Sequence, residues 1–178
     1  MGAASHHGVP RSVLGFPNPV NEAAARTVAA GVLALTVLTL ALSTTRGHGW
    51  LWLTTPLAYG FVARVLTGPT LSPLGQLATR VVAPRIAHQK LVAGPPKRFA
   101  QAMGATMSLA AVVLHWGFGL DVAALVLVGL IAVAATLESV FAFCVGCTAF
   151  AGLMRVGLVP AQTCAACAVT SLRAQQAA

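Results

Sequence analysis

The chain has 178 residues, of which 57% are hydrophobic and only 8% are charged. Soluble domains carry about 25% charged residues, so this chain lacks the polar side chains needed to cover a water-facing surface. Intrinsic disorder is excluded because disordered chains are poor in apolar residues. Eleven basic residues outnumber three acidic ones, but they are scattered between apolar segments and form no dense stripe for nucleic acid. The composition therefore predicts a protein of the lipid bilayer.

Four apolar segments are each long enough to cross a bilayer as an α-helix. They cover residues 27–43, 49–66, 99–118 and 122–143. Trp50 and Trp52 begin the second segment, where aromatic side chains suit a membrane interface. The pattern predicts an all-α fold, namely an integral membrane four-helix bundle.

The basic residues indicate which side of the membrane each connection faces. The long connection between the second and third segments carries five cations, whereas the two opposite turns carry only Arg46. These five are Arg80, Arg85, Lys90, Lys97 and Arg98. Because cytoplasmic loops are enriched in Lys and Arg, we expect a multi-pass protein of the inner (plasma) membrane with both termini in the cytoplasm. The predicted organisation is a cytoplasmic N-terminal segment 1–25, a four-span domain 26–158 with the cytoplasmic connection 68–98, and a cytoplasmic tail 159–178.

The cytoplasmic connection contains one predicted helix. Ser72 and Pro73 form a helix start, and Leu74, Leu77 and Val81 recur at helical spacing after it. We therefore expect a short interfacial helix between spans two and three. It can rest on the lipid headgroups as a connector, or it can be a docking surface for a soluble partner.

All four cysteines occur as two Cys-x-x-Cys pairs, Cys144 with Cys147 and Cys164 with Cys167. This spacing brings two sulfurs to one helical face, which suits reversible disulfide formation, persulfide transfer or shared metal ligation. Cysteine is also a common small side chain of buried helices, so either pair can be simple packing. The two pairs are the strongest candidate sites in the chain.

The first pair lies where the fourth span reaches the predicted cytoplasmic side. Gly146 removes bulk between the two sulfurs, and Arg155 and the basic connection supply positive charge that lowers a thiol pKa. A dithiol that faces the cytoplasm rests in the reduced state. We predict that Cys144 attacks a disulfide or persulfide on a thioredoxin-like or rhodanese-like protein and that Cys147 resolves the product.

A zinc site is an alternative use of the same residues. The pattern Cys-x2-Cys-x16-Cys-x2-Cys falls within the spacing of four-thiolate zinc sites, with Cys144, Cys147, Cys164 and Cys167 as ligands. However, Cys144 is predicted to continue the apolar helix of span four, and the tail would have to fold back to close the site. Disulfide exchange between the two pairs is a further alternative, by analogy with membrane oxidoreductases.

Glu138 is the only acid within a predicted span, and a carboxyl group in hydrocarbon needs a partner. Arg64 lies at similar depth in the second span, which predicts a structural ion pair between the two, with Gln101 as a further partner. Glu138 can instead exchange protons with the dithiol as a catalytic group. On an ideal helix Cys144 and Cys147 lie about 120° and 180° around the axis from Glu138, so direct contact is not expected.

Four short motifs occur in a fixed order along the chain. They are FPNPVNE at 16–22, SPLG at 72–75, GPPKRFAQ at 94–101 and FCVGC at 143–147. Together they resemble the small membrane proteins grouped as domain-of-unknown-function family 4395, over about residues 16–158. The resemblance implies a bacterial integral membrane protein with a Cys-x-Gly-Cys pair and no settled activity. The second pair, Cys164 and Cys167, departs from that pattern.

Two functions remain open at this point. The first is a membrane protein that presents a cytoplasmic dithiol for thiol–disulfide exchange or persulfide relay, without a cofactor. The alternative is a structural or accessory membrane subunit in which the cysteines pack or bind zinc.

Overall fold

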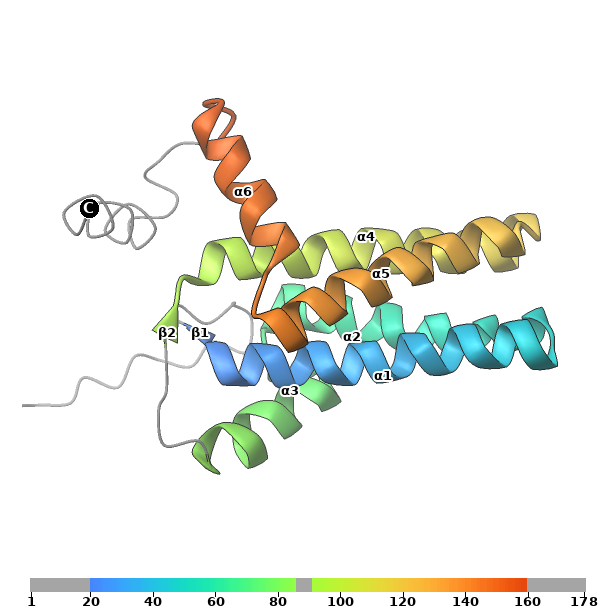
Figure 1. Cartoon of the computed structure of the whole chain (residues 1–178), viewed down its shortest axis with the longest axis horizontal. Helices are drawn as coiled ribbons and strands as arrows, with labels where there is room; N and C mark the ends of the chain where they lie inside the picture. Colours follow the sequence, from blue (N-terminus) through green and yellow to red (C-terminus); the bar gives the residue numbers. More distant parts are fainter. Residues whose placement is uncertain (1–19, 86–90, 160–178) are drawn as a thin grey trace, which may run out of the picture.

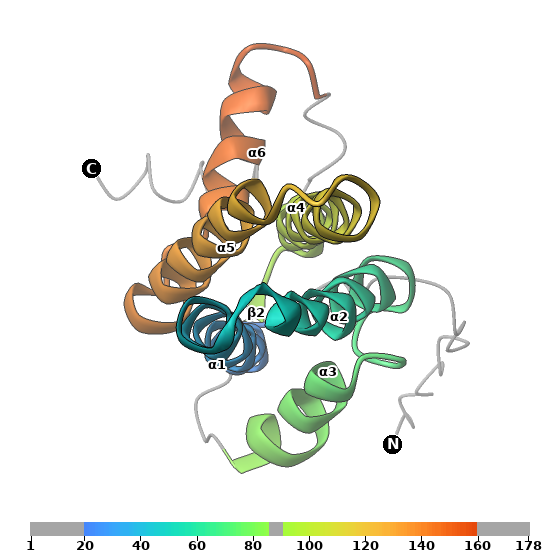
Figure 2. The same cartoon turned by 90° about the vertical axis from the view of Figure 1, so that its right-hand side faces the viewer.

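The computed structural model describes residues 20–85 and 91–159. These residues are mostly helical, which confirms the predicted all-α class. Four helices lie side by side along the long axis of the molecule (Figure 1): α1 (Glu22–Arg46), α2 (Thr54–Thr67), α4 (Gly94–Phe118) and α5 (Asp121–Phe141). Viewed from the end, α1 lies next to α5 and α2 lies next to α4 (Figure 2).

Three of these helices, α1, α4 and α5, are long and apolar enough to cross a membrane. The second predicted segment, 49–66, is divided, because the 3₁₀ helix η1 (His48–Leu53) leads into α2. Pro56 explains the division, since proline has no N–H and fits only within the first turn of an α-helix. At about 2.0 Å per 3₁₀ residue and 1.5 Å per α-helical residue, η1 and α2 together extend roughly 33 Å.

Local signals explain where α1 and α4 begin. Asn21 caps α1, because its Oδ1 accepts from the N–H of Ala23 at 2.9 Å. Helix α4 begins at Gly94, five residues before the third predicted segment, with Pro95 and Pro96 in its first turn. This earlier start brings Lys97 into the helix.

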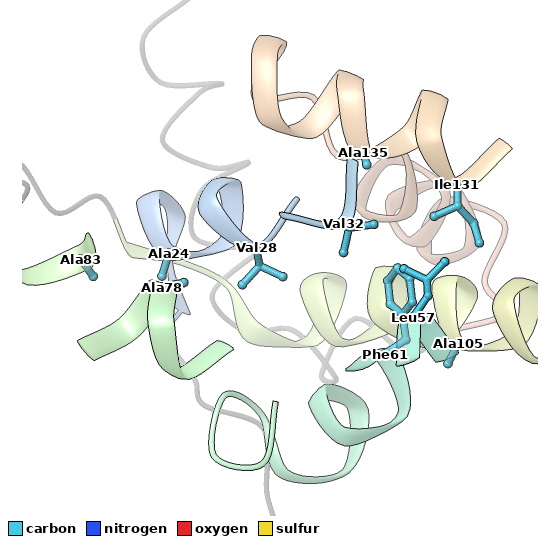
Figure 3. Packing of buried hydrophobic residues seen from close by; sticks show 10 residues of the cluster. All are labelled: Ala24, Val28, Val32, Leu57, Phe61, Ala78, Ala83, Ala105, Ile131 and Ala135. Atoms are coloured by element: carbon cyan, nitrogen blue, oxygen red, sulfur yellow. The ribbon is translucent and has the colours of Figure 1, made fainter. Parts of the chain in front are cut away.

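The core between the helices is built from small and medium-sized side chains (Figure 3). It contains Ala24, Val28, Val32, Leu57, Phe61, Ala78, Ala83, Ala105, Ile131 and Ala135. Phe61 packs so closely on α4 that a Cβ at Gly104 would lie 2.3 Å from its ring. Large apolar side chains such as Val37, Val113 and Val133 instead point outward and are more than half exposed. The bundle therefore has an apolar outer surface, as a lipid environment requires.

The segment between α2 and α4 contains the helix predicted from Ser72 and Pro73. It comprises α3 (Pro73–Leu77), the π-helical turn η2 (Ala78–Val82) and the 3₁₀ turn η3 (Ala83–Arg85). The Ser72 hydroxyl caps α3 by accepting from the N–H of Gly75. Strand β1 (Val20–Asn21) pairs antiparallel with β2 (Leu91–Val92), which places the starts of α1 and α4 at the same end of the bundle. Lys90 lies outside the described residues.

The sequence predicts that the helix of span four continues into the first cysteine pair, and this is wrong. Helix α5 ends at Phe141, and Ala142 adopts a left-handed conformation with φ 56°. The Leu137 carbonyl accepts from the N–H groups of both Ala142 and Phe143 and so closes the helix. A separate helix, α6 (Val145–Arg155), then leaves the bundle at a steep angle (Figure 1).

Candidate functional site

The first cysteine pair occupies the N-terminus of α6. Cys144 is the N-cap residue, and its Sγ accepts from the backbone N–H of Cys147 at 3.3 Å. Both cysteines are free; Cys144 is 8% exposed and Cys147 is half-buried. The free N–H groups of a helix N-terminus stabilise negative charge, so this position favours the thiolate of Cys144.

The two thiols differ in acidity. The hydrogen bond from the Cys147 thiol lowers the pKa of Cys144 below its ordinary value, and the nearby Lys97 ammonium acts in the same direction. Burial and the Glu138 carboxylate oppose this change without reversing it. The pKa of Cys147 is raised, first because its thiol donates to Cys144 and second because it is buried. Cys144 is therefore the more acidic thiol of the pair, and Cys147 is the one that keeps its proton.

Close packing against α4 positions the start of α6. A Cβ at Gly146 would lie 2.5 Å from both Cα and Cβ of Ala100, so only glycine permits this approach. One turn further along α6, Phe150 packs against Phe99 with ring centroids 5.6 Å apart. These contacts hold Cys144 beside the first turns of α4.

An ion pair joins α4 to α5 beside the dithiol. The Lys97 ammonium donates to Oε1 of Glu138, and the two side chains are only 11% and 14% exposed. The sequence predicts Arg64 as the partner of Glu138, and this is wrong: Lys97 forms the pair. The Pro-Pro start of α4 is the sequence signal for this pairing, because it places Lys97 inside the helix and not in the predicted connection 68–98.

Arg64 is buried close by and has other partners. Its Nε donates to Oε1 of Gln101 at 2.7 Å, and its Nη1 donates to Oγ of Ser72 at 3.0 Å. Its guanidinium carbon also lies 4.7 Å from the centre of the Phe61 ring. Gln101 is thus a partner of Arg64, and the Ser72 cap links the connection to the site.

A cavity of about 410 Å³ extends from the dithiol into the bundle between α1, α4 and α5. Most of its lining is apolar, but Cys144, Glu138 and Gln101 belong to it. Cys144 and Glu138 thus line one space, which an ideal continuous helix would not allow. The break at Ala142 is responsible, because it redirects the chain back toward α4.

The sequence profile of one family, described as Domain of unknown function (DUF4395), matches residues 20–155. The chain belongs to the DUF4395 family. The match covers the bundle, the ion pair and the Cys144–Cys147 pair. No curated protein and no solved structure matches the chain.

The remaining predicted residues of this DUF4395 protein lie away from the dithiol or outside the described part. Arg155 is exposed in the last turn of α6, about 16 Å along the helix from Cys144, so Lys97 is the nearer cation. Cys164 and Cys167 lie outside the described residues and outside the family match. Within residues 20–85 and 91–159, no group of three or more His, Cys, Asp or Glu side chains is placed to hold a metal ion.

Proposed function

We propose that this DUF4395 protein is a multi-pass protein of the bacterial inner membrane that presents the Cys144–Cys147 dithiol to the cytoplasm for thiol–disulfide exchange or persulfide relay. The observation that carries the proposal is the position of Cys144 at a helix N-terminus, hydrogen-bonded by Cys147 and close to Lys97. A low-pKa thiol with a second thiol three residues later is the arrangement that such chemistry requires.

The arrangement of helices supports four crossings. Helices α1, α4 and α5 are long enough, and η1 with α2 reaches roughly 33 Å, against a hydrocarbon core of about 30 Å. Cations gather at the end of the bundle where α1 and α4 begin and α2 and α5 end, which is also the end that α6 adjoins (Figure 1). They lie near the start of α1, near the end of α2, in η2 and η3, and near the start of α4: Arg26, Arg64, Arg80, Arg85, Lys97 and Arg98. By the positive-inside rule this end faces the cytoplasm.

Thiol–disulfide exchange begins with attack of the Cys144 thiolate on one sulfur of a partner's disulfide. A mixed disulfide forms, and the partner's other sulfur leaves as a thiolate. Cys147 then loses its proton and attacks Sγ of Cys144, which forms the Cys144–Cys147 disulfide and releases the partner as a dithiol. For sulfur relay, Cys144 attacks the terminal sulfur of a partner persulfide, so that the persulfide moves to Cys144 and the partner keeps a thiolate.

A thiol-state assay in intact cells tests this function. Cells are treated with a mild oxidant, and the free thiols are then alkylated with a reagent that shifts the protein mass. A Cys164→Ser, Cys167→Ser variant restricts the readout to Cys144 and Cys147, which we expect to cycle between dithiol and disulfide. Thiols that stay reduced and unreactive would contradict the proposal.

Orientation needs a separate measurement with a membrane-impermeant maleimide. Arg46 is exposed at the opposite end of the bundle, so a single cysteine introduced by Arg46→Cys should react from outside the cell. Cys144 and Cys147 should react only after the membrane is opened. Labelling of the native pair from outside would overturn the cytoplasmic orientation.

The burial of Cys144 favours a second candidate, an accessory membrane subunit whose cysteines pack or bind zinc. Zinc content of the purified full-length protein distinguishes this function from the first. One zinc per chain, lost on replacing either cysteine pair by serine, would establish the metal site.

A further inference from the structure

The cavity beside the dithiol has the length and lining of a binding site for an apolar molecule. It follows residues 100–107 of α4 and 130–138 of α5, which corresponds to roughly 11 Å along α4 and about 12 Å along α5. Its volume of about 410 Å³ falls within the range of small-molecule sites. Leu130 and Val133 belong to its lining and are 52% and 59% exposed, so the cavity meets the outer surface of α5. Under the proposed function that surface contacts lipid, from which a ligand can enter sideways.

The polar groups of the cavity gather at one end. Because α4 and α5 run antiparallel, Gln101 near the start of α4 and Glu138 near the end of α5 lie at the same level, next to Cys144. Arg64 holds Oε1 of Gln101, which leaves the amide nitrogen as the donor available to a ligand. Glu138 accepts a hydrogen bond from Lys97 and supplies the carboxylate of the lining. The other end is apolar and is formed by Met107 of α4 and by Leu130 and Ile131 of α5.

We propose that this cavity binds a membrane-soluble quinone, which accepts the electrons of the Cys144–Cys147 dithiol. A quinone has a ring with carbonyl oxygens that accept hydrogen bonds and an apolar tail, so its two ends match the two ends of the cavity. A saturated acyl chain would fill the apolar end but would use neither the amide donor nor the thiol. The inference rests on the proposed function, with the exchange running in its reverse direction: a partner dithiol reduces the Cys144–Cys147 disulfide and leaves as a disulfide, and the quinone then oxidises the Cys144–Cys147 dithiol again.

The electron transfer balances without another reactant. The Cys144 thiolate adds to a ring carbon of the quinone, and the Cys147 thiolate then attacks Sγ of Cys144. The S–S bond forms, the carbon–sulfur bond breaks, and its electron pair remains on the ring. The two protons that left the thiols are taken up by the two ring oxygens, with Glu138 placed to relay them. Two thiols and one quinone thus become one disulfide and one hydroquinone.

The test uses the full-length Cys164→Ser, Cys167→Ser protein in lipid nanodiscs. After reduction and removal of the reductant, a decyl-substituted benzoquinone is added; its absorbance reports reduction, and mass spectrometry reports the Cys144–Cys147 disulfide. We expect one hydroquinone per chain, and none with Cys144→Ser. Binding is measured separately by crosslinking an azido-quinone to the Cys144→Ser, Cys147→Ser protein, which should still be labelled on α4 and α5.

A matched pair of variants tests the cavity itself. Ala134 lines the cavity and is half-buried, whereas Ala123 on the same helix is exposed and does not line it. Ala134→Trp should weaken quinone binding by roughly tenfold or more, and Ala123→Trp should leave it unchanged. If Ala134→Trp does not fold, Ala134→Leu fills less of the space and should give a smaller loss.

The outcomes separate this inference from the proposed function. If the dithiol cycles with a disulfide-bearing partner or a chemical oxidant but never reduces the quinone, the quinone site is wrong and the thiol function stands. Displacement of the azido-quinone by saturated lipid, without electron transfer, also overturns the site. If the dithiol reacts with no oxidant, both proposals fail.

Discussion

Replacing Gly146 by alanine tests whether the approach of α6 to α4 positions the dithiol. The new Cβ would lie 2.5 Å from Cα and Cβ of Ala100, whereas ordinary contacts begin at 3.4 Å. The start of α6 must therefore move away by about 0.9 Å, because a backbone atom and its Cβ cannot rotate aside. Overpacking of this kind costs about 1–3 kcal/mol. The shift also carries Cys144 away from Lys97, so the Cys144 thiolate should form less readily.

Gly152 on the same helix provides the matched control. A Cβ at this position meets nothing within 4 Å. Gly152→Ala should therefore stabilise α6 by about 0.5–1 kcal/mol, since alanine loses less backbone entropy than glycine in a helix. The same replacement of glycine by alanine is therefore expected to lower the stability at position 146 and to raise it at position 152.

Two measurements check this prediction. Denaturant unfolding in detergent gives the change in stability, and the rate of Cys144 alkylation at one fixed pH gives the change in thiolate population. Gly146→Ala should lower both, and Gly152→Ala should leave the alkylation rate unchanged. If Gly146→Ala unfolds at the same denaturant concentration as Gly152→Ala and alkylates at the rate of the native protein, the packing argument is refuted.

Three further predictions concern the ion pair and the thiols. Lys97→Met leaves Glu138 buried without its partner and should destabilise the bundle by about 3–5 kcal/mol in denaturant unfolding, whereas adding Glu138→Leu should restore much of this lost stability. If the destabilisations of the two single variants simply add in the double variant, the pairing is contradicted. The pH profile of Cys144 alkylation should have its midpoint below the ordinary thiol value of about 8.5, because the lowered pKa preserves the thiolate as the pH falls. Cys147→Ala should raise that midpoint, because it removes the hydrogen-bond donor; an unchanged midpoint would mean that Cys147 does not control the pKa of Cys144. Cys147→Ser should accumulate a mixed disulfide with the protein partner on non-reducing gels, and Cys144→Ser should not; the reverse pattern would exchange the roles of the two cysteines.

The hydropathy of the chain was enough to predict the class of protein and three of its long helices. Residues 27–43, 99–118 and 122–143 fall almost entirely within α1, α4 and α5, because a run of apolar side chains of this length can satisfy its backbone in lipid only as a helix. The Ser72–Pro73 start was also readable, since both residues act through local geometry. Local signals of this kind need no knowledge of the neighbouring helices.

The sequence alone determined the candidate site residues, namely a cysteine pair and the one acid within the predicted spans. The tertiary structure decided how they meet. No glycine or proline marks the turn at Ala142. The chain turns there because Gly146 can approach Ala100 closely, so that the start of α6 packs against α4. The same packing of antiparallel helices sets Lys97 opposite Glu138, a pairing across 41 positions that no local pattern specifies. Contacts between distant segments depend on how whole helices fit together, and only the folded chain contains that information.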